Sequence, residues 1–218
     1  MHIAVIGASG WLGGLIAREA IARGHTVTAV GRDASRLEIP GTRIAVADLD
    51  DPDSIATAVA SADVVVSSVT DRTTDDRSRI AATVRTLLDV LPRAGVSRVA
   101  FVGGGGSLET APGVRAVDAP TFPGEYKAEA LAQADALAIL RAHAGPPDWT
   151  YMSPPPHYLV PGEKSGRYIV RGGDSPAVNE SGESWITAGD FAAAFVDELE
   201  NDQFPRRRFT AGAVDPRG

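Results

Sequence analysis

Short apolar runs rich in β-branched residues recur along the first two thirds of the chain, and longer amphipathic stretches separate them. The short runs predict strands, and the stretches with apolar residues every three or four positions predict helices. Strands are predicted near residues 2, 26, 43, 63, 98 and 149, and helices over 11–24, 52–62, 77–95 and 125–145. Strands that alternate with helices indicate βαβ units and a parallel sheet.

Several of these strands are apolar at successive positions, as in AVIG after residue 3 and VVV after residue 63. Such runs are typical of strands that helices cover on both faces. Because crossovers between parallel strands are right-handed, the pattern predicts an α/β fold of the Rossmann type, with a doubly wound, open parallel sheet.

The regular alternation ends near residue 153, where a segment rich in proline and glycine begins. We therefore expect one domain over 1–218, with a core over 1–153 and a small region over 154–218 that covers a substrate. This region is predicted to contain short strands near 166–170 and 184–187, a helix over 186–200 and a last strand near 206–212. The arginine run 206–208 is expected to be a solvated edge of the sheet, since such charges discourage edge pairing.

The composition of the chain argues against several classes of ligand and partner. The chain has 21 Lys and Arg against 28 Asp and Glu, a net charge of −7, which argues against a nucleic-acid partner. It has no Cys, and its four His include no pair spaced for a helical metal site, so we expect no metal. The first residues already read as a strand, and no apolar run reaches the roughly 18 residues that cross a bilayer, so we expect a cytoplasmic protein without a membrane partner.

A glycine motif, GASGWLG, directly follows the first strand and opens the first helix. Gly7 would allow the sharp turn, Gly10 would let the backbone approach a pyrophosphate, and Gly13 would allow close packing of helix on strand. The free N–H groups at the helix start would bind the phosphates. The alternative is a tight turn that binds nothing. The predicted phosphate contacts are Gly7, Ser9, Gly10, Trp11, Leu12 and Gly13.

The end of the second strand bears on the choice of dinucleotide. An acidic residue there usually binds the ribose 2′-hydroxyl of NAD, whereas arginine pairs with the 2′-phosphate of NADP. This chain offers Arg32, with Arg36 one turn later, so NADP(H) is predicted over NAD(H). The alternative is that Asp33 binds the ribose and reverses the preference.

The remaining strand ends supply further candidate contacts. Asp48 and Leu49 would bind and cover an adenine, while Asp50 or Asp51 caps the helix near Pro52. Other cofactor contacts are predicted at the ends of the fourth, fifth and sixth strands: Ser67, Ser68, Val69, Gly103, Gly104 and Pro154. Ser107 would hydrogen-bond a substrate carbonyl or a flavin edge. The alternative for the glycine-rich fifth strand end is a flexible turn.

Tyr126 and Lys127 stand next to each other, and position 130 is alanine. Short-chain dehydrogenases usually carry Tyr and Lys four residues apart on one helix face, but adjacent helical residues point about 100° apart. This pair therefore cannot act as that dyad, although either residue remains a candidate contact to the nicotinamide ribose or the substrate.

The motifs GASGWLG, VGRD, ADLDD, VGGGGSLETAPG, FPGEYKAEA, DWTYMSPPP, PGEKSGRY and ITAGDFAAAFVDELE occur in this order. In this respect the chain resembles atypical short-chain dehydrogenase/reductases named NAD(P)H-flavin reductases, close to the NmrA-like group. The resemblance implies one Rossmann domain with a small C-terminal part over the substrate. It also implies the roles given above for the glycine loop, Arg32, Asp48, Leu49 and the nicotinamide side, with Lys127 as the single helix lysine. His157 follows three prolines, one residue out of register with the Pro-Pro-His segment of a biliverdin-reducing relative.

The leading hypothesis is an NADPH-dependent oxidoreductase that passes hydride to a flavin, bound as a substrate, or to another flat small acceptor. Such transfer depends on alignment more than on a protein acid, which fits the missing dyad. The alternatives are an NADP(H)-sensing protein without turnover, and a carbonyl reductase or epimerase. A monomer or homodimer is expected. The catalytic candidates are Ser107, Tyr126, Lys127 and His157.

Overall fold

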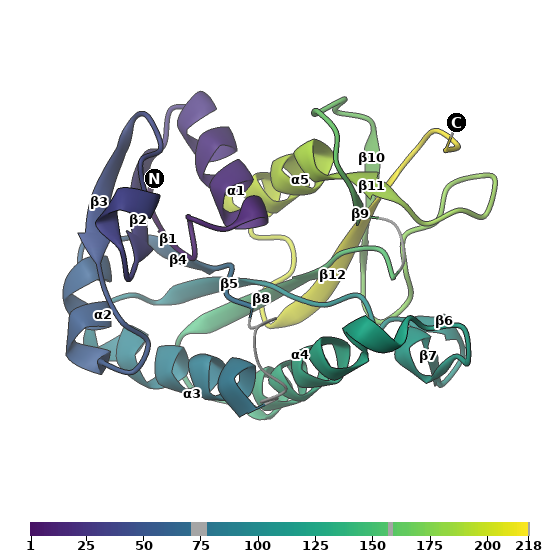
Figure 1. The fold of residues 1–218 in the computed structure, drawn as a ribbon, viewed down its shortest axis with the longest axis horizontal. Helices are drawn as coiled ribbons and strands as arrows, with labels where there is room; N and C mark the ends of the chain where they lie inside the picture. The colour runs from purple at the N-terminus through teal and green to yellow at the C-terminus, as the bar shows by residue number, and fades with distance from the viewer. Residues whose placement is uncertain (71–77, 157–158, 218) are drawn as a thin grey trace.

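The computed structural model describes residues 1–70, 78–156 and 159–217, which contain an eight-stranded sheet (Figure 1). The strand order is β10-β12-β8-β5-β4-β1-β2-β3, and β10 alone runs antiparallel to its neighbour in this sheet. The strands are β1 (His2–Ile6), β2 (Thr26–Gly31), β3 (Thr42–Val46), β4 (Val64–Ser67), β5 (Arg98–Val102), β8 (Asp148–Ser153), β10 (Tyr168–Gly172) and β12 (Arg207–Ala213).

Helices cover both faces of this sheet, α1 and α5 on one and α2, α3 and α4 on the other (Figure 1). Their bounds are α1 (Trp11–Ala22), α2 (Pro52–Val59), α3 (Ser78–Arg93), α4 (Gly124–Ala142) and α5 (Ala188–Asn201). Smaller elements are η1 (Ala34–Arg36), η2 (Ala116–Asp118), the pair β6 (Glu109–Ala111) and β7 (Val114–Arg115), and the pair β9 (Leu159–Val160) and β11 (Ile186–Thr187). The predicted α/β, doubly wound fold is confirmed.

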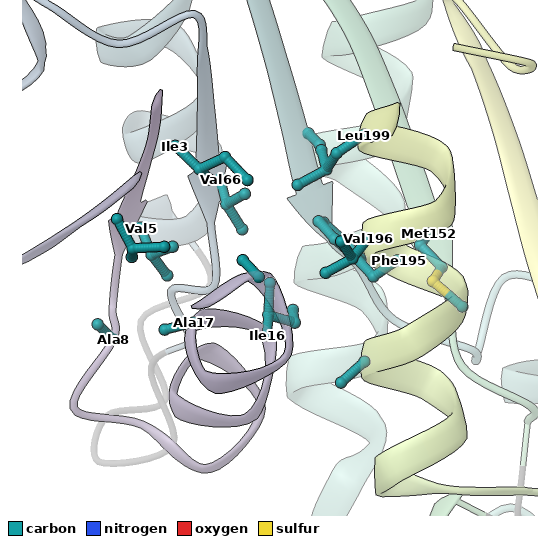
Figure 2. Packing of buried hydrophobic residues seen from close by; sticks show 14 of the residues in the cluster. Ile3, Val5, Ala8, Ile16, Ala17, Val66, Met152, Phe195, Val196 and Leu199 are labelled. Atoms are coloured by element: carbon teal, nitrogen blue, oxygen red, sulfur yellow. The ribbon is translucent and has the colours of Figure 1, made fainter. Parts of the chain in front are cut away.

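The two faces of the sheet each bury a hydrophobic cluster. Ile3 and Val5 of β1 point to the α1 and α5 side, and Ala4 and Ile6 point to the other side. This explains why the central strands show no alternation of apolar and polar residues. Figure 2 shows the first cluster, where side chains of α1 and α5 meet those of the strands: Ile16, Ala17, Phe195, Val196, Leu199, Ile3, Val5 and Val66.

The last helix and strand are part of the same core. The helix predicted over 186–200 is α5, which packs beside α1, and the strand predicted near 206–212 is β12, which lies between β8 and β10. The expectation of an edge strand at the arginine run is therefore wrong, and the expected exposure to solvent holds for Arg206 and Arg207 but not for Arg208. Arg208 is only 3% exposed, and Arg206 donates to the carbonyl oxygens of Ala144 and Gly145. The proposed boundary at residue 153 stays a prediction.

Two kinds of feature are absent from the described residues. None of the helices there combines the length and apolar character that a bilayer crossing requires. The same residues place no three His, Asp or Glu side chains together where they could hold a metal ion.

Candidate dinucleotide-binding site

The turn between β1 and α1 is built on two glycines that the fold requires. Gly7 has a φ of 86°, which L side chains rarely adopt, and a Cβ there would lie 2.4 Å from the carbonyl oxygen of Ser68. A Cβ on Gly13 would lie 2.3 Å from the carbonyl oxygen of Gly7. These contacts hold the start of α1 tightly against the residues that follow β4, as the motif predicts.

Gly10 differs from Gly7 and Gly13 because the space around its Cα is not filled by the packing of the fold. It has ordinary extended angles, φ −81° and ψ 166°, is exposed, and a Cβ there would meet only the carbonyl oxygen of Gly7, at 3.2 Å. Among the described residues no side chain caps α1, and the first turn of the helix carries no acidic residue. The helix therefore presents free N–H groups and its positive end over a bare backbone, an arrangement that in general favours an anion such as a pyrophosphate.

The other predicted contacts of this loop differ in exposure. Trp11 is 51% exposed at the first position of α1, and Ser9 is also exposed. Leu12 packs partly buried against the cluster beneath α1 and α5. Ser9 and Trp11 are thus accessible to a ligand at this helix start.

The carboxyl ends of β1, β4, β5 and β8 meet along one edge of the sheet, because these strands are parallel neighbours. This brings together the glycine turn, Ser67 at the end of β4 with the two residues after it, the glycines directly after β5, and Pro154. Ser67 is buried, and the N–H of Ser68 donates to the carbonyl oxygen of Ile6. Open α/β sheets bind their ligands along this edge.

At the end of β2, Asp33 is held by hydrogen bonds within the chain, whereas Arg32 and Arg36 are not in salt bridges with the described residues. The carboxylate of Asp33 accepts hydrogen bonds from the Ser35 hydroxyl at 2.7 Å and the Ser35 N–H at 3.0 Å, and so caps η1. These hydrogen bonds lower the pKa of Asp33. Arg32 and Arg36 are exposed, and neither enters a salt bridge within the described part of the chain. The cations are the groups left available to a ligand here.

The end of β3 carries the residues predicted to bind adenine. Asp48 is exposed, and its carboxylate accepts a hydrogen bond from the N–H of Asp50 at 3.1 Å, while Leu49 packs against the second cluster. Asp51 caps α2 by accepting from the Ser54 N–H at 3.3 Å, and Pro52 opens the helix. The helix cap is therefore Asp51, which leaves the adenine role of Asp48 and Leu49 as a prediction.

The glycines after β5 are required by packing. A Cβ on Gly103 would lie 2.1 Å from ring atoms of Tyr151, and one on Gly104 would lie 2.8 Å from the Cβ of Gln133. Tyr151 is fully buried, accepts a hydrogen bond from the Gly104 N–H at 3.0 Å and donates to Gln133. Burial raises the pKa of Tyr151 to about 12, so it remains a neutral phenol. Tyr151 is not among the predicted site residues, because it lies on β8 and nothing in its local sequence signals this contact.

The catalytic candidates occupy different surroundings. Ser107 is half-buried, and its Oγ accepts a hydrogen bond from Nη1 of Arg208 at 2.8 Å. Tyr126 and Lys127 are both exposed in the first turn of α4, where Lys127 contributes to lowering the pKa of Asp118 after the larger effect of Arg115. His157 lies outside the described residues.

The segment predicted to cover a substrate is tied to α1 and α5. Nζ of Lys164 donates to Glu19 of α1 at 2.9 Å. The buried carboxylate of Asp190 accepts from the N–H groups of Ser165 and Gly166, both at 2.8 Å. These bonds hold residues 164–166 against the first turn of α5, and the covering role stays a prediction.

A glycine turn at the first strand end, an uncapped helix start and a doubly wound parallel sheet define a Rossmann-type dinucleotide-binding protein. A model of the NAD(P)H-binding family matches residues 7–202, and the chain belongs to this family. The ligand that this family binds is a nicotinamide dinucleotide, and the contact of its phosphates with the glycine turn stays a prediction.

Solved structures of similar proteins cover nearly the whole chain. A provisionally named exported protein from Burkholderia pseudomallei is 42% identical, with 97% of this chain and 99% of that one covered and a TM-score of 0.87. A provisionally named epimerase from Bacteroides thetaiotaomicron is 33% identical, with 100% and 99% covered and a TM-score of 0.89. A provisionally named NADH-flavin reductase from Streptococcus pneumoniae is 34% identical, with 98% and 99% covered and a TM-score of 0.86.

Proposed function

We propose that this protein is an NADPH-dependent oxidoreductase that passes hydride to a flavin, taken as a substrate, or to another flat small acceptor. The observation that carries this proposal is the open Gly10 at the uncapped start of α1, on the sheet edge where the candidate contacts converge. The similarity to the Streptococcus pneumoniae protein supports a flavin as the acceptor.

In this proposal each segment at the carboxyl edge of the sheet binds one part of the cofactor. The N–H groups at the start of α1 bind the pyrophosphate, Arg32 and Arg36 bind the 2′-phosphate, and the residues after β3 bind the adenine. The Gly103–Ser107 segment and Pro154 border the nicotinamide, which when bound supplies the hydride. The chain's own contribution is alignment, because Tyr126 and Lys127 do not form the usual dyad.

The preference for NADPH is testable through the two arginines. Replacing both Arg32 and Arg36 by Gln is expected to weaken NADPH binding by at least about 100-fold, since each charge-assisted bond to a phosphate contributes roughly 1.5–3 kcal/mol. NADH affinity should stay within about twofold, because NADH lacks the 2′-phosphate. Isothermal titration of both nucleotides measures this, with Arg171→Gln on β10 as an exposed arginine control. Equal losses for NADH and NADPH would contradict the assignment.

The hydride transfer itself is tested by stopped-flow oxidation of NADPH with FMN, FAD and small quinones. The wild-type protein is expected to oxidise NADPH faster than a Gly10→Asp variant, whose cofactor site is blocked. Tight NADPH binding with no oxidation of NADPH by any of these acceptors would overturn the proposal and favour a cofactor-sensing protein.

A further inference from the structure

Ser107 is held by an arginine that the fold buries almost completely. Arg208 lies on β12, and its Nη1 donates to the Ser107 Oγ at 2.8 Å while its Nη2 donates to the Ser107 carbonyl oxygen at 3.2 Å. The arginine side chain is 1% exposed. Two bonds from one planar guanidinium fix both the backbone and the hydroxyl of Ser107 at the end of the β5 segment.

The charge of Arg208 is balanced by one carboxylate. Asp174, in the turn after β10, forms an ion pair with Arg208 and another with Arg141 of α4. The Nε of Arg208 is buried and has no hydrogen-bond partner within the described residues. A buried arginine that is only partly satisfied is poor evidence for added stability, because an apolar side chain of similar volume often serves the fold as well or better. The arrangement is better explained by what it does to Ser107.

The bond from Arg208 determines which way the Ser107 hydroxyl can donate. A serine hydroxyl has one hydrogen to donate and two lone pairs that accept, whereas a guanidinium only donates. The Ser107 Oγ must therefore accept from Arg208, and its own hydrogen is left for another acceptor. Because a cation draws electron density from Oγ, this hydrogen is also a stronger donor than that of an unpaired serine.

We propose that Arg208 is a positioning residue that makes Ser107 the hydrogen-bond donor to a carbonyl oxygen of the acceptor, an inference that rests on the proposed function. The acceptor class is a flat ring whose carbonyl is conjugated with the atom that receives hydride, as in flavins and quinones. The Ser107–Arg208 pair thereby takes the place of the Tyr–Lys dyad that the chain lacks.

The charge balance of the step supports this role. Two electrons and one hydrogen pass as hydride from the nicotinamide to the acceptor ring, whose conjugated carbonyl oxygen gains negative charge, and water supplies the proton that completes reduction. In this proposal the Ser107 hydroxyl donates to this oxygen and stabilises the charge as it develops, which is the effect of an oxyanion hole.

Binding provides the first test and needs no turnover. FMN is titrated into the protein saturated with NADP⁺, with flavin fluorescence as the readout. Ser107→Ala and Arg208→Met are each expected to weaken FMN binding about 5-fold, the effect of one lost hydrogen bond. The double variant should bind FMN no more weakly than Ser107→Ala alone, because both changes remove the same bond. Losses that multiply, or FMN binding that does not change, would overturn the inference.

Turnover provides the second test. In each single variant kcat with FMN is expected to fall about 100-fold while NADPH affinity stays within about twofold, since removal of one oxyanion donor costs about 10²–10³ in kcat. Arg208→Lys should recover part of the lost kcat because one donor is restored. If Arg208→Met does not fold, Ser107→Ala and Arg208→Lys are compared instead: kcat of Arg208→Lys is expected to lie between those of Ser107→Ala and the wild-type protein, and a wild-type kcat in Ser107→Ala would overturn the inference.

A matched control separates positioning from stability. Arg206 precedes β12 and donates to Asp148 and to the carbonyl oxygens of His143–Gly145, away from Ser107. Arg206→Met is expected to lower the melting temperature and to leave kcat unchanged. If the wild-type protein oxidises NADPH but the Ser107 and Arg208 variants do so equally fast, this inference alone fails. A wild-type protein that binds NADPH and reduces none of the acceptors would overturn the proposed function together with the inference.

Discussion

A Gly10→Asp variant is expected to lose NADPH binding by at least about 100-fold while folding as stably as the wild-type protein, or slightly more so. Gly10 has angles that any residue adopts, and it is exposed, so an aspartate fits there with a small adjustment against the Gly7 carbonyl oxygen, 3.2 Å from its Cβ. Aspartate is a favoured N-cap residue and would satisfy N–H groups that no side chain of the described residues now caps, which relative to glycine is worth roughly a few tenths of a kcal/mol. The same carboxylate would occupy the pyrophosphate site and repel it.

The two opposite effects make this prediction specific. Isothermal titration with NADPH and thermal unfolding of the same samples measure binding and stability separately. Gly10→Asn is the matched control, because it has nearly the same size and also caps the helix but carries no charge, so it should bind NADPH more tightly than Gly10→Asp. A variant that keeps wild-type affinity would show that the phosphates do not lie at the start of α1.

A Gly103→Ala variant is expected to lose about 3 kcal/mol of unfolding free energy, at the upper end of the range for overpacked cores. The added methyl would lie 2.1 Å from ring atoms of Tyr151, whose ring is fully buried and cannot move aside without disturbing the core around it. The backbone of Gly103 is also fixed, since its N–H donates to the carbonyl oxygen of Met152 at 2.9 Å.

A double-mutant cycle tests whether Tyr151 is the cause. Tyr151→Leu removes the ring, so adding Gly103→Ala to it should cost much less than adding Gly103→Ala to the wild-type protein, as measured by urea unfolding. Gly124→Ala, in the first turn of α4 with nothing near its Cβ, should leave stability unchanged or slightly raise it. Equal costs of Gly103→Ala in both backgrounds would mean that the clash lies elsewhere.

Features that depend on neighbouring residues could be predicted from the sequence. The strands near residues 2, 26, 43, 63, 98 and 149 are β1, β2, β3, β4, β5 and β8, because local periodicity encodes them. Gly7 and Gly13 have the turn and packing roles that the motif predicts. The hydrogen bond from the Ser35 N–H to the Asp33 carboxylate is local as well. It could be predicted from the sequence, because an aspartate followed two residues later by a serine is the pattern of an Asx turn.

The remaining features depend on residues far apart in the chain. The contact of Gly103 with Tyr151 spans 48 positions and requires β8 to pair with β5, whereas that of Ser107 with Arg208 spans 101 and also requires β12 to pair with β8. From the sequence, the arginine run 206–208 is predicted to lie at a solvated edge of the sheet. Nothing in the local sequence reveals that β12 lies between β8 and β10 and that Arg208 is buried. The sequence by itself therefore determined the layered fold and the glycine turn, through local periodicity and backbone constraints. Only the tertiary structure decided which glycines are packed, which is left open, and which charge is buried against Ser107, because strand order alone brings those groups together.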